Sequence, residues 1–386
     1  MTRGTVLVGA TGFGLIAVCY GFGRFAFGLF MPRIASDLAL SPALGGTISG
    51  ASFVGYCLAI ALAAWLTERF GPRPVAVAAG VIAAAGMAGI AVAPSPLWLA
   101  VAVVLAGSST GLASPPLAAA VTALVRARSQ DSTNTAINAG TSAGVALSGL
   151  VAIAMGGQWR LAFSGFAVAA LAMAVATLVV LTGTHGRNEA ATTGLPVLTP
   201  DLRRLIGAAL LAGAASAAIW TFGADLVAQH LDWDGEQVGV LWVTMGALGV
   251  LGASAGWLIE RAGLVAVHRA ALVALALGIV AVGHTQTQAG LALVGGGVFG
   301  AAYLMLTGVY LVWGTAALPE RPASGVTVAF LALAVGQALG APLFGFMLEH
   351  VAANGAVLAF AALALGAAAI RSHGLAGPRS EACLPG

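Results

Sequence analysis

The chain has 386 residues, of which 60% are hydrophobic and only 8% are charged, with a formal net charge of +3. A soluble domain carries about 25% charged residues and needs polar surface to cover its core, so this composition excludes a soluble globular protein. All sixteen basic residues are arginine. The absence of lysine excludes a phosphate-binding G-x-x-x-x-G-K-[ST] loop and a Schiff-base lysine.

Apolar stretches long enough to cross a bilayer recur along the chain and are separated by short polar breaks. The pattern predicts an all-α membrane protein with twelve transmembrane helices. In chain order, the expected helices cover roughly 5–30, 44–66, 75–92, 97–125, 134–155, 160–182, 205–228, 237–259, 265–282, 289–315, 325–348 and 355–370.

The placement of arginine orients these helices. Arg24 falls inside a helix, Arg33 and Arg160 fall at outer helix ends, and the other thirteen of the sixteen arginines fall at inner ends or in the inner breaks, counted from an N-terminus inside the cell. An excess of arginine on one side is typical of cytoplasmic loops. We therefore expect a multi-pass protein of the inner membrane with both termini in the cytoplasm.

Two corresponding helix ends share a sequence. Residues 64–71 read AWLTERFG and residues 256–263 read GWLIERAG, at an offset of 192 positions. Residues 144–147 (GVAL) and 336–339 (GQAL) agree at the same offset. The repeat predicts two parallel six-helix halves. The expected divisions are an N-terminal half at 1–182, a cytoplasmic linker at 183–202, a C-terminal half at 203–371 and a cytoplasmic tail at 372–386.

The first repeated segment resembles the G-x-x-x-D-R-x-G-R-R motif of the major facilitator superfamily, with Glu68 in place of the aspartate. Residues 157–163 (GQWRLAF) are similar to that family's G-W-R-x-x-F helix entrance, and residues 21–25 (GFGRF) to one bacterial branch. The resemblance covers nearly the whole chain. It implies two pseudo-symmetric six-helix halves and secondary transport by alternating access.

The resemblance also implies a cytoplasmic gate. In that family the acidic residue of the motif approaches the start of a helix in the opposite half, where unpaired N–H groups carry partial positive charge. Glu68 would approach the helix starting near Gly325, and Glu260 the helix starting near Thr133. A solvated pair of loop charges is the alternative. The residues of the expected gate are Glu68, Arg69, Gly71, Arg73, Glu260, Arg261 and Gly263.

Two positions depart from the proton-coupled drug exporters of the family. Gly107 occupies the position of their arginine in the fourth helix, and Ser148, Gly149 and Leu150 replace a Gly-Pro pair in the fifth. Proton antiport is therefore left open, whereas transport is not affected.

Arg24 lies about two-thirds of the way along the first helix, with no charged neighbour in sequence. An arginine near a helix centre costs at least about 2.5–3.5 kcal/mol on insertion scales, so it usually faces a cavity or a partner. We interpret Arg24 as a cationic anchor, with Tyr20 one turn away; snorkelling to the outer interface is the alternative. Asp225 is the candidate for proton binding or for pairing with Arg24, unless it only faces water at its helix end.

Polar and aromatic side chains in other helices extend the candidate substrate path. Some share one face of the fifth helix and others one face of the tenth. Helix–helix hydrogen bonding and interfacial anchoring are the alternatives. The expected substrate-binding residues are Arg24, Tyr20, Asn138, Thr141, Trp220, Tyr303, Thr307, Tyr310 and Gln337.

The sequence therefore predicts a secondary transporter that moves a small molecule by alternating access, with efflux of an amphipathic drug or metabolite as the first interpretation. Uptake or exchange of a small organic anion held by Arg24 is the alternative. A membrane-embedded enzyme or receptor is not favoured, because the spans hold no convergent catalytic or metal-ligand set and no break is long enough for a soluble domain. We expect a monomer in the lipid bilayer with no cofactor, no metal, no ATP and no nucleic acid; coupling to protons stays open.

Overall fold

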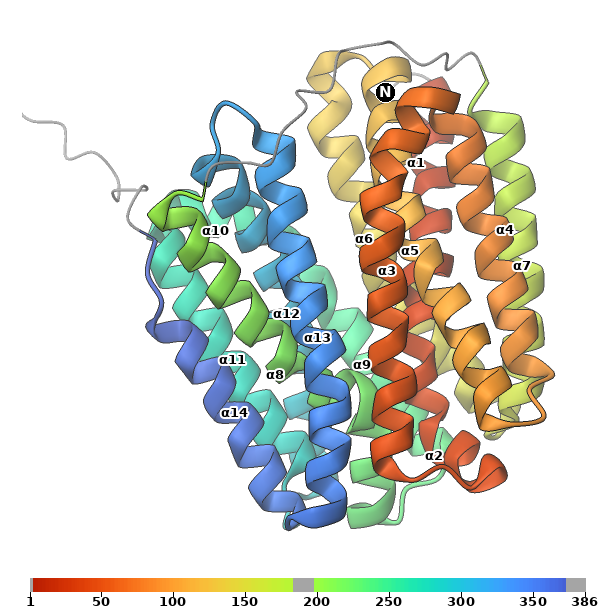
Figure 1. Ribbon diagram of the computed structural model, residues 1–386, viewed down its shortest axis with the longest axis vertical. Coiled ribbons are helices and arrows are strands. Elements are labelled where there is room, and N and C mark those ends of the chain that lie inside the picture. Colours follow the sequence, from red (N-terminus) through yellow and green to blue (C-terminus); the bar gives the residue numbers. More distant parts are fainter. Residues whose placement is uncertain (1–2, 183–197, 373–386) are drawn as a thin grey trace, which may run out of the picture.

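The computed structural model describes residues 3–182 and 198–372, whose helices run lengthwise through one bundle (Figure 1). Within these residues, eleven helical segments are long and apolar enough to cross a membrane, and the shorter apolar helix α14 (Ala353–Ala369) brings the total to twelve. The predicted all-α fold of twelve membrane helices is confirmed. The linker residues 183–197 and the tail residues 373–386 lie outside the described part of the chain.

The helices divide into two groups along the chain. The first contains α1 (Arg3–Ile16), the π-helix η1 (Ala17–Phe25), α2 (Ala26–Leu38), α3 (Pro42–Phe70), α4 (Pro72–Ala91), α5 (Pro96–Leu124), the short helix η2 (Ala127–Ser129), α6 (Gln130–Met155) and α7 (Trp159–Val180). The second contains α8 (Pro200–Leu231), α9 (Gly235–Gly249), η3 (Val250–Ser254), α10 (Ala255–Ala262), α11 (Leu264–Gly283), α12 (Ala289–Ala317), α13 (Pro322–His350) and α14.

Three of these helices begin with the same local signal. Ser41, Ser95 and Thr199 each stand directly before a proline, and each side chain accepts a hydrogen bond from a backbone N–H two residues beyond that proline. The side chain satisfies a donor that the helix leaves free, and proline fits the first helical position because its missing N–H is not needed there. For this reason α8 begins at Pro200, although the sequence analysis extended the linker to 202.

The first membrane segment is longer than the sequence suggested. We expected it to end near Phe30, but α1, η1 and α2 form one continuous segment of 36 residues that ends at Leu38. Pro32 lies inside α2 and does not end it. The segment stops at Ala39, whose backbone is left-handed (φ 51°).

The repeated segments make the same turn in both halves. Gly71 has φ 85° and ψ 163°, and Gly263 has φ 82° and ψ 151°. Residues other than glycine adopt this region at a large steric cost. Each glycine N–H also bonds the carbonyl four residues earlier, at Thr67 and Ile259. The shared W-L-x-E-R-x-G sequence thus specifies one helix-to-helix turn used twice.

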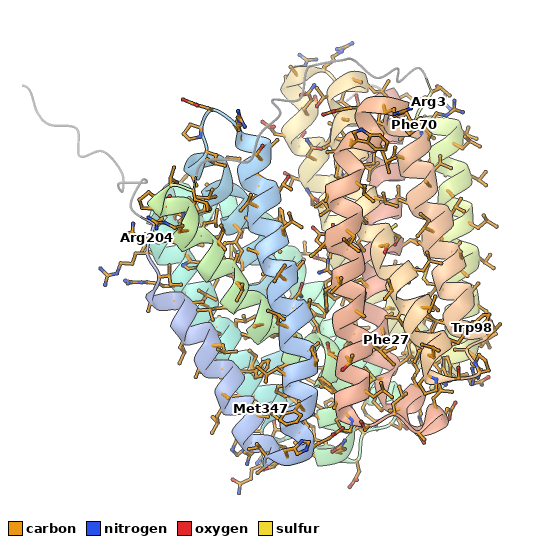
Figure 2. The ribbon with its side chains drawn as sticks, in the orientation of Figure 1. Arg3, Phe27, Phe70, Trp98, Arg204 and Met347 are labelled. Carbon is orange, nitrogen blue, oxygen red and sulfur yellow. The ribbon has the colours of Figure 1, made fainter. Side chains whose placement is uncertain are left out.

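Basic residues gather at one end of the bundle, which we call the Arg-rich end. In Figure 2, Arg3, Phe70 and Arg204 lie toward this end, and Trp98 and Met347 lie toward the opposite end. By the helix order, the described arginines at the Arg-rich end are Arg3, Arg69, Arg73, Arg126, Arg128, Arg203, Arg204, Arg261, Arg269, Arg321 and Arg371.

The two halves contact each other mainly through α3 with α13 and through α6 with α9. Glycines allow the helix backbones to come close. A Cβ on Gly50 would lie 2.6 Å from the Ala338 carbonyl oxygen, and a Cβ on Gly239 would lie 2.6 Å from a side-chain carbon of Ile153. These contacts lie away from the Arg-rich end, toward which the ribbons of the two halves diverge (Figure 1).

Candidate functional site

A π-helical segment of the first membrane helix carries Arg24. The nine residues of η1 include Tyr20, Gly21, Gly23 and Arg24. A Cβ on Gly21 would collide with the backbone of Gly144 in α6, so only glycine lets these two helices approach so closely. Isolated π-helical turns within α-helices are frequent at functional sites.

The Arg24 side chain lies inside the protein and bonds across the two halves. It is 9% exposed, and its Nη2 donates a hydrogen bond of 2.7 Å to Oε1 of Gln337 in α13. Its guanidinium carbon lies 4.5 Å from the ring centre of Phe53 and 4.6 Å from that of Tyr56, both in α3. Cation–π attraction of this kind partly replaces hydration. Arg24 therefore does not extend to the outer membrane interface, which the snorkelling alternative required.

Gln337 connects Arg24 to a polar cluster in the second half. Its Nε2 donates to the Tyr303 hydroxyl at 3.2 Å and to the Ser216 hydroxyl at 3.4 Å. Gln337 and Ser216 are fully buried and Tyr303 is 4% exposed. The cluster therefore joins α8, α12 and α13 and presents a neutral amide oxygen to a cation.

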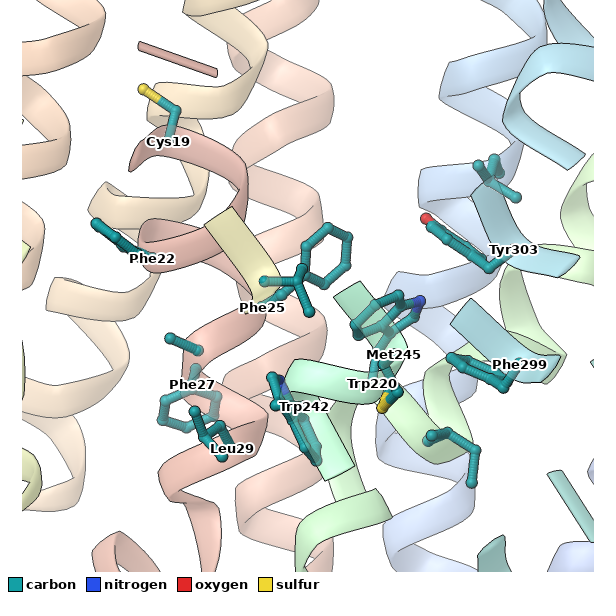
Figure 3. Close-up of a cluster of buried hydrophobic side chains, with 14 of the residues drawn as sticks. Cys19, Phe22, Phe25, Phe27, Leu29, Trp220, Trp242, Met245, Phe299 and Tyr303 are labelled. Atoms are coloured by element: carbon teal, nitrogen blue, oxygen red, sulfur yellow. The ribbon is translucent and has the colours of Figure 1, made fainter. Parts of the chain in front are cut away.

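Aromatic rings pack beside this polar cluster. Phe25 and Trp220 have ring centres 4.2 Å apart, and Trp220 lies 5.3 Å from Tyr303 and 5.4 Å from Phe299. Figure 3 shows these four rings grouped between the first membrane helix, α8 and α12. We call Arg24, Phe25, Trp220, Tyr303 and Gln337 together the Arg24 centre. Each of its residues was a predicted site residue except Phe25.

Two donors of the Arg24 centre have no hydrogen-bond partner among the described residues. They are Nε of Arg24 and the indole Nε1 of Trp220, and both atoms are buried. An unpartnered buried donor is costly, so each such group calls for an explanation. Both can donate to an acceptor group of a bound molecule.

The positive charge of Arg24 is not neutralised within the described residues. No carboxylate there lies within ion-pair distance of its guanidinium. Asp225, the suggested partner, lies nearer the opposite end of α8 and accepts a hydrogen bond of 2.7 Å from Gln229. It is half-buried and stays a candidate for proton binding.

The other predicted substrate-binding residues lie at different distances from this centre. Tyr20 adjoins it, with its ring centre 5.9 Å from the Arg24 guanidinium carbon and its hydroxyl 2.9 Å from that of Ser114. Asn138 is exposed and Thr141 half-buried on α6, and half-buried Thr307 bonds its own helix at Leu304.

Tyr310 belongs to a separate buried cluster. Its hydroxyl donates to the Ala208 carbonyl at 3.2 Å and lies 3.3 Å from Nε2 of His268. Trp313 lies 5.3 Å from the same imidazole and donates to Asp201 at 3.0 Å. This cluster joins α8, α11 and α12 within the second half and does not reach Arg24.

Of the residues of the expected gate, the two Glu-Arg pairs (Glu68, Arg69, Glu260 and Arg261) are exposed in this structure, Arg73 and Gly263 are half-buried, and Gly71 is buried. No hydrogen bond or ion pair within the described chain involves the carboxylate of Glu68 or Glu260. The guanidinium carbon of Arg261 lies 4.1 Å from the ring centre of Trp257, and Arg73 donates to the Leu178 carbonyl at 2.9 Å.

The corresponding Arg69 lies 5.4 Å from the ring centre of Trp65, so the arginine and tryptophan of each repeat stack in the same way. Because the halves diverge at the Arg-rich end, the inter-half contacts of the gate stay a prediction.

Sequence reasoning did not find Phe53, Tyr56, Ser216 or Phe299. Aromatic and hydroxyl residues inside apolar helices are common, so none of them stands out alone. Ser49, Ser52 and Tyr56 do recur at helical spacing in α3, and this polar face was a usable signal. No group of three or more metal-ligating side chains is found in the described residues.

The bundle of two six-helix halves with a polar centre between them defines a membrane transporter, and the model of the Major Facilitator Superfamily matches residues 13–340. The chain belongs to this superfamily of secondary transporters, which confirms the family resemblance and the prediction that it is not an enzyme.

A relative from Streptomyces lividans, described as a chloramphenicol resistance protein, is 31% identical over 373 residues, covering 92% of this chain and 85% of the relative.

Solved structures share the fold at low sequence identity. The nucleoside transporter NupG matches 95% of this chain and 98% of its own with a TM-score of 0.76 and 14% identity. A bacterial homolog of the human lysosomal transporter Spinster, in an inward-facing and occupied conformation, matches 95% of this chain and 96% of its own with a TM-score of 0.76 and 16% identity.

Proposed function

We propose that the chain exports small amphipathic compounds through the Arg24 centre, with its Arg-rich end facing the cytoplasm. The observation that carries this proposal is the hydrogen bond between Arg24 and Gln337, because it joins the two halves at a buried site that holds both polar donors and aromatic rings. Sites for amphipathic ligands combine apolar walls with a few directed polar groups.

The orientation rests on arginine placement. Arginine is retained preferentially on the cytoplasmic side of a membrane protein, and most described arginines gather at one end. With that end inside, the contacts between α3 and α13 and between α6 and α9 close the periplasmic side, and the structure corresponds to an inward-facing state. Export would then require these contacts to separate after the cytoplasmic side closes.

The direction of transport rests on the relative from Streptomyces lividans. That protein is described by resistance to a drug, and export is the simplest way for a transporter to confer resistance. Asp225 is the proposed proton-binding group, because it is a half-buried carboxylate in a membrane helix and its described contact is a neutral amide.

Reconstitution tests the proposal. The full-length chain would be placed in proteoliposomes with chloramphenicol and a set of amphipathic aromatic dyes, and their movement would be followed with and without a pH gradient. Protein-dependent movement away from the Arg-rich end, toward the other side of the membrane, supports export. Movement only toward the Arg-rich end would contradict export, and no protein-dependent movement of any compound would contradict the proposed substrate range.

A further inference from the structure

We propose that the Arg24 centre selects aromatic compounds that carry an anionic oxygen group, such as a carboxylate, and that this group replaces Gln337 as the partner of Arg24. The inference rests on the proposed function, since it names the substrate class of the same site. It specifies the charge of the transported compound, which the proposed export of amphipathic compounds does not.

The charge of Arg24 is uncompensated within the described residues. Arg24 is 9% exposed and its described hydrogen bond is to a neutral amide. A buried charge is costly unless a counter-charge pairs with it. The π-rings of Phe53 and Tyr56 supply only partial compensation. The site thus has a net positive charge that an anionic ligand would neutralise.

The Arg24 centre also holds a pair of donors available to a ligand. Nε of Arg24 and Nε1 of Trp220 are both buried, and neither has a hydrogen-bond partner in the described part of the chain. Both belong to one cluster, because Phe25, the residue after Arg24, packs against Trp220 in a tilted arrangement with ring centres 4.2 Å apart. A carboxylate has two oxygens and accepts from several donors at once, and hydrogen bonds to an ionised acceptor are the stronger kind. A neutral carbonyl oxygen can also accept from two donors, but it carries no charge, so its hydrogen bonds are the weaker kind.

Aromatic rings form a wall at the Arg24 centre. The rings of Phe25, Trp220, Phe299 and Tyr303 pack against one another (Figure 3), and the Arg24 guanidinium carbon lies 5.5 Å from the ring centre of Phe25. Ring edges and faces attract other rings in offset or edge-to-face geometry. The centre therefore suits a flat ring joined to an anionic group more closely than an aliphatic anion.

The side-chain oxygen of Gln337 can be displaced from Arg24 by an anion. Its Nε2 is already held by the hydroxyls of Tyr303 and Ser216, so the amide keeps partners when its oxygen leaves Arg24. A carboxylate offers Arg24 a charge-assisted bond instead of a neutral one. Exchange of this kind would break the bond between the two halves each time the anion binds.

The test compares two probes of nearly identical shape. Binding of 2-naphthoate and of its neutral amide, 2-naphthamide, would be measured by titration calorimetry on the purified full-length chain. We expect 2-naphthoate to bind at least about tenfold more tightly, because it makes charge-assisted bonds that the amide cannot make. Equal binding of the two probes, or tighter binding of the amide, would overturn the proposal.

Two variants test the proposal further, and both keep the Arg24 side chain and do not leave its charge without a partner. Gln337→Glu places a carboxylate beside Arg24, so it should remove the preference for 2-naphthoate over 2-naphthamide. Trp220→Phe keeps a ring but removes the indole donor, so it should weaken 2-naphthoate binding more than 2-naphthamide binding. A preference unchanged in Gln337→Glu would place the anion elsewhere and overturn the proposal.

Trp242→Phe is the matched control. Trp242 has an equally buried and unpartnered indole N–H but is fully buried outside the Arg24 centre. It should leave the preference unchanged. If 2-naphthamide binds as well as 2-naphthoate and both are transported, the charge proposal fails while the export proposal stands. If 2-naphthoate binds selectively but is not moved across the membrane, selection stands and export fails.

Discussion

The Oε1 atom of Glu349, near the end of α13, accepts a hydrogen bond of 2.7 Å from the backbone N–H of Ala43, in the first turn of α3. The bond joins the two halves at the opposite end of the bundle. A helix start carries unpaired N–H groups and partial positive charge, so a carboxylate is favoured there. This contact, a carboxylate at the start of a helix in the other half, lies at the closed end of the structure. The same kind of contact is expected of Glu68 at the Arg-rich end.

Glu349→Gln should loosen this closed end. The amide keeps the length of the side chain but loses the charge, so a larger fraction of molecules should open there. In a background without the three native cysteines, an Ala341→Cys probe at the inter-half contact should react faster with a membrane-impermeant maleimide. Glu236→Gln, an exposed change at the same end, is the control. Equal labelling in both variants would show that Glu349 does not hold the halves together.

Glu68→Gln should act at the Arg-rich end. If Glu68 approaches the start of α13 when that end closes, loss of its charge should disfavour the closed form. A Ser324→Cys probe beside Gly325 should then label faster from the Arg-rich side. Glu320→Gln, an exposed change close to the probe, is the control. No increase in labelling over this control would mean that Glu68 is only a solvated loop charge.

Gly263→Ala should destabilise the second copy of the repeated turn. A side chain at φ 82° and ψ 151° costs on the order of 1–3 kcal/mol, although no atom would collide with the new Cβ. Gly256→Ala is the matched control, because it is also free of close neighbours and lies inside helix α10. The melting temperature should fall for Gly263→Ala alone; an equal effect in both variants would contradict a role for backbone strain.

Asp225→Asn should separate proton coupling from substrate movement. The asparagine can still bond Gln229 but cannot take up a proton. We expect transport driven by a pH gradient to be lost, while exchange of substrate between equal concentrations continues. Asp232→Asn, an exposed change just beyond α8, should keep both activities. Gradient-driven transport that survives in Asp225→Asn would exclude this carboxylate as the coupling site.

The sequence singled out candidate site residues by their polarity, because charged and amide groups are rare inside apolar helices. Arg24 and Gln337 stood out for this reason, and the structure places them 2.7 Å apart although 313 positions separate them. That pairing could not be predicted, because helical periodicity says which face a residue occupies and not which distant helix it meets.

Two features of the first membrane segment were also missed. The π-helix of η1 changes the number of residues per turn without a sequence signal that periodicity detects. We expected this segment to end near Phe30, but it continues to Leu38, because the helix ends only where the Ala39 backbone turns left-handed. Tertiary packing against α8, seen at Gly28 beside the Trp220 carbonyl, supports this extension.

The most direct test is substrate counterflow in proteoliposomes with the wild-type chain and Arg24→Ala. A labelled compound that the wild-type chain transports would be followed as it exchanges against unlabelled compound, with Arg33→Ala, an arginine at the opposite end, as the control. The proposed role of the Arg24 centre predicts that Arg24→Ala abolishes counterflow while the purified variant keeps its helical content and elution volume. Wild-type rates in a folded Arg24→Ala variant would contradict it.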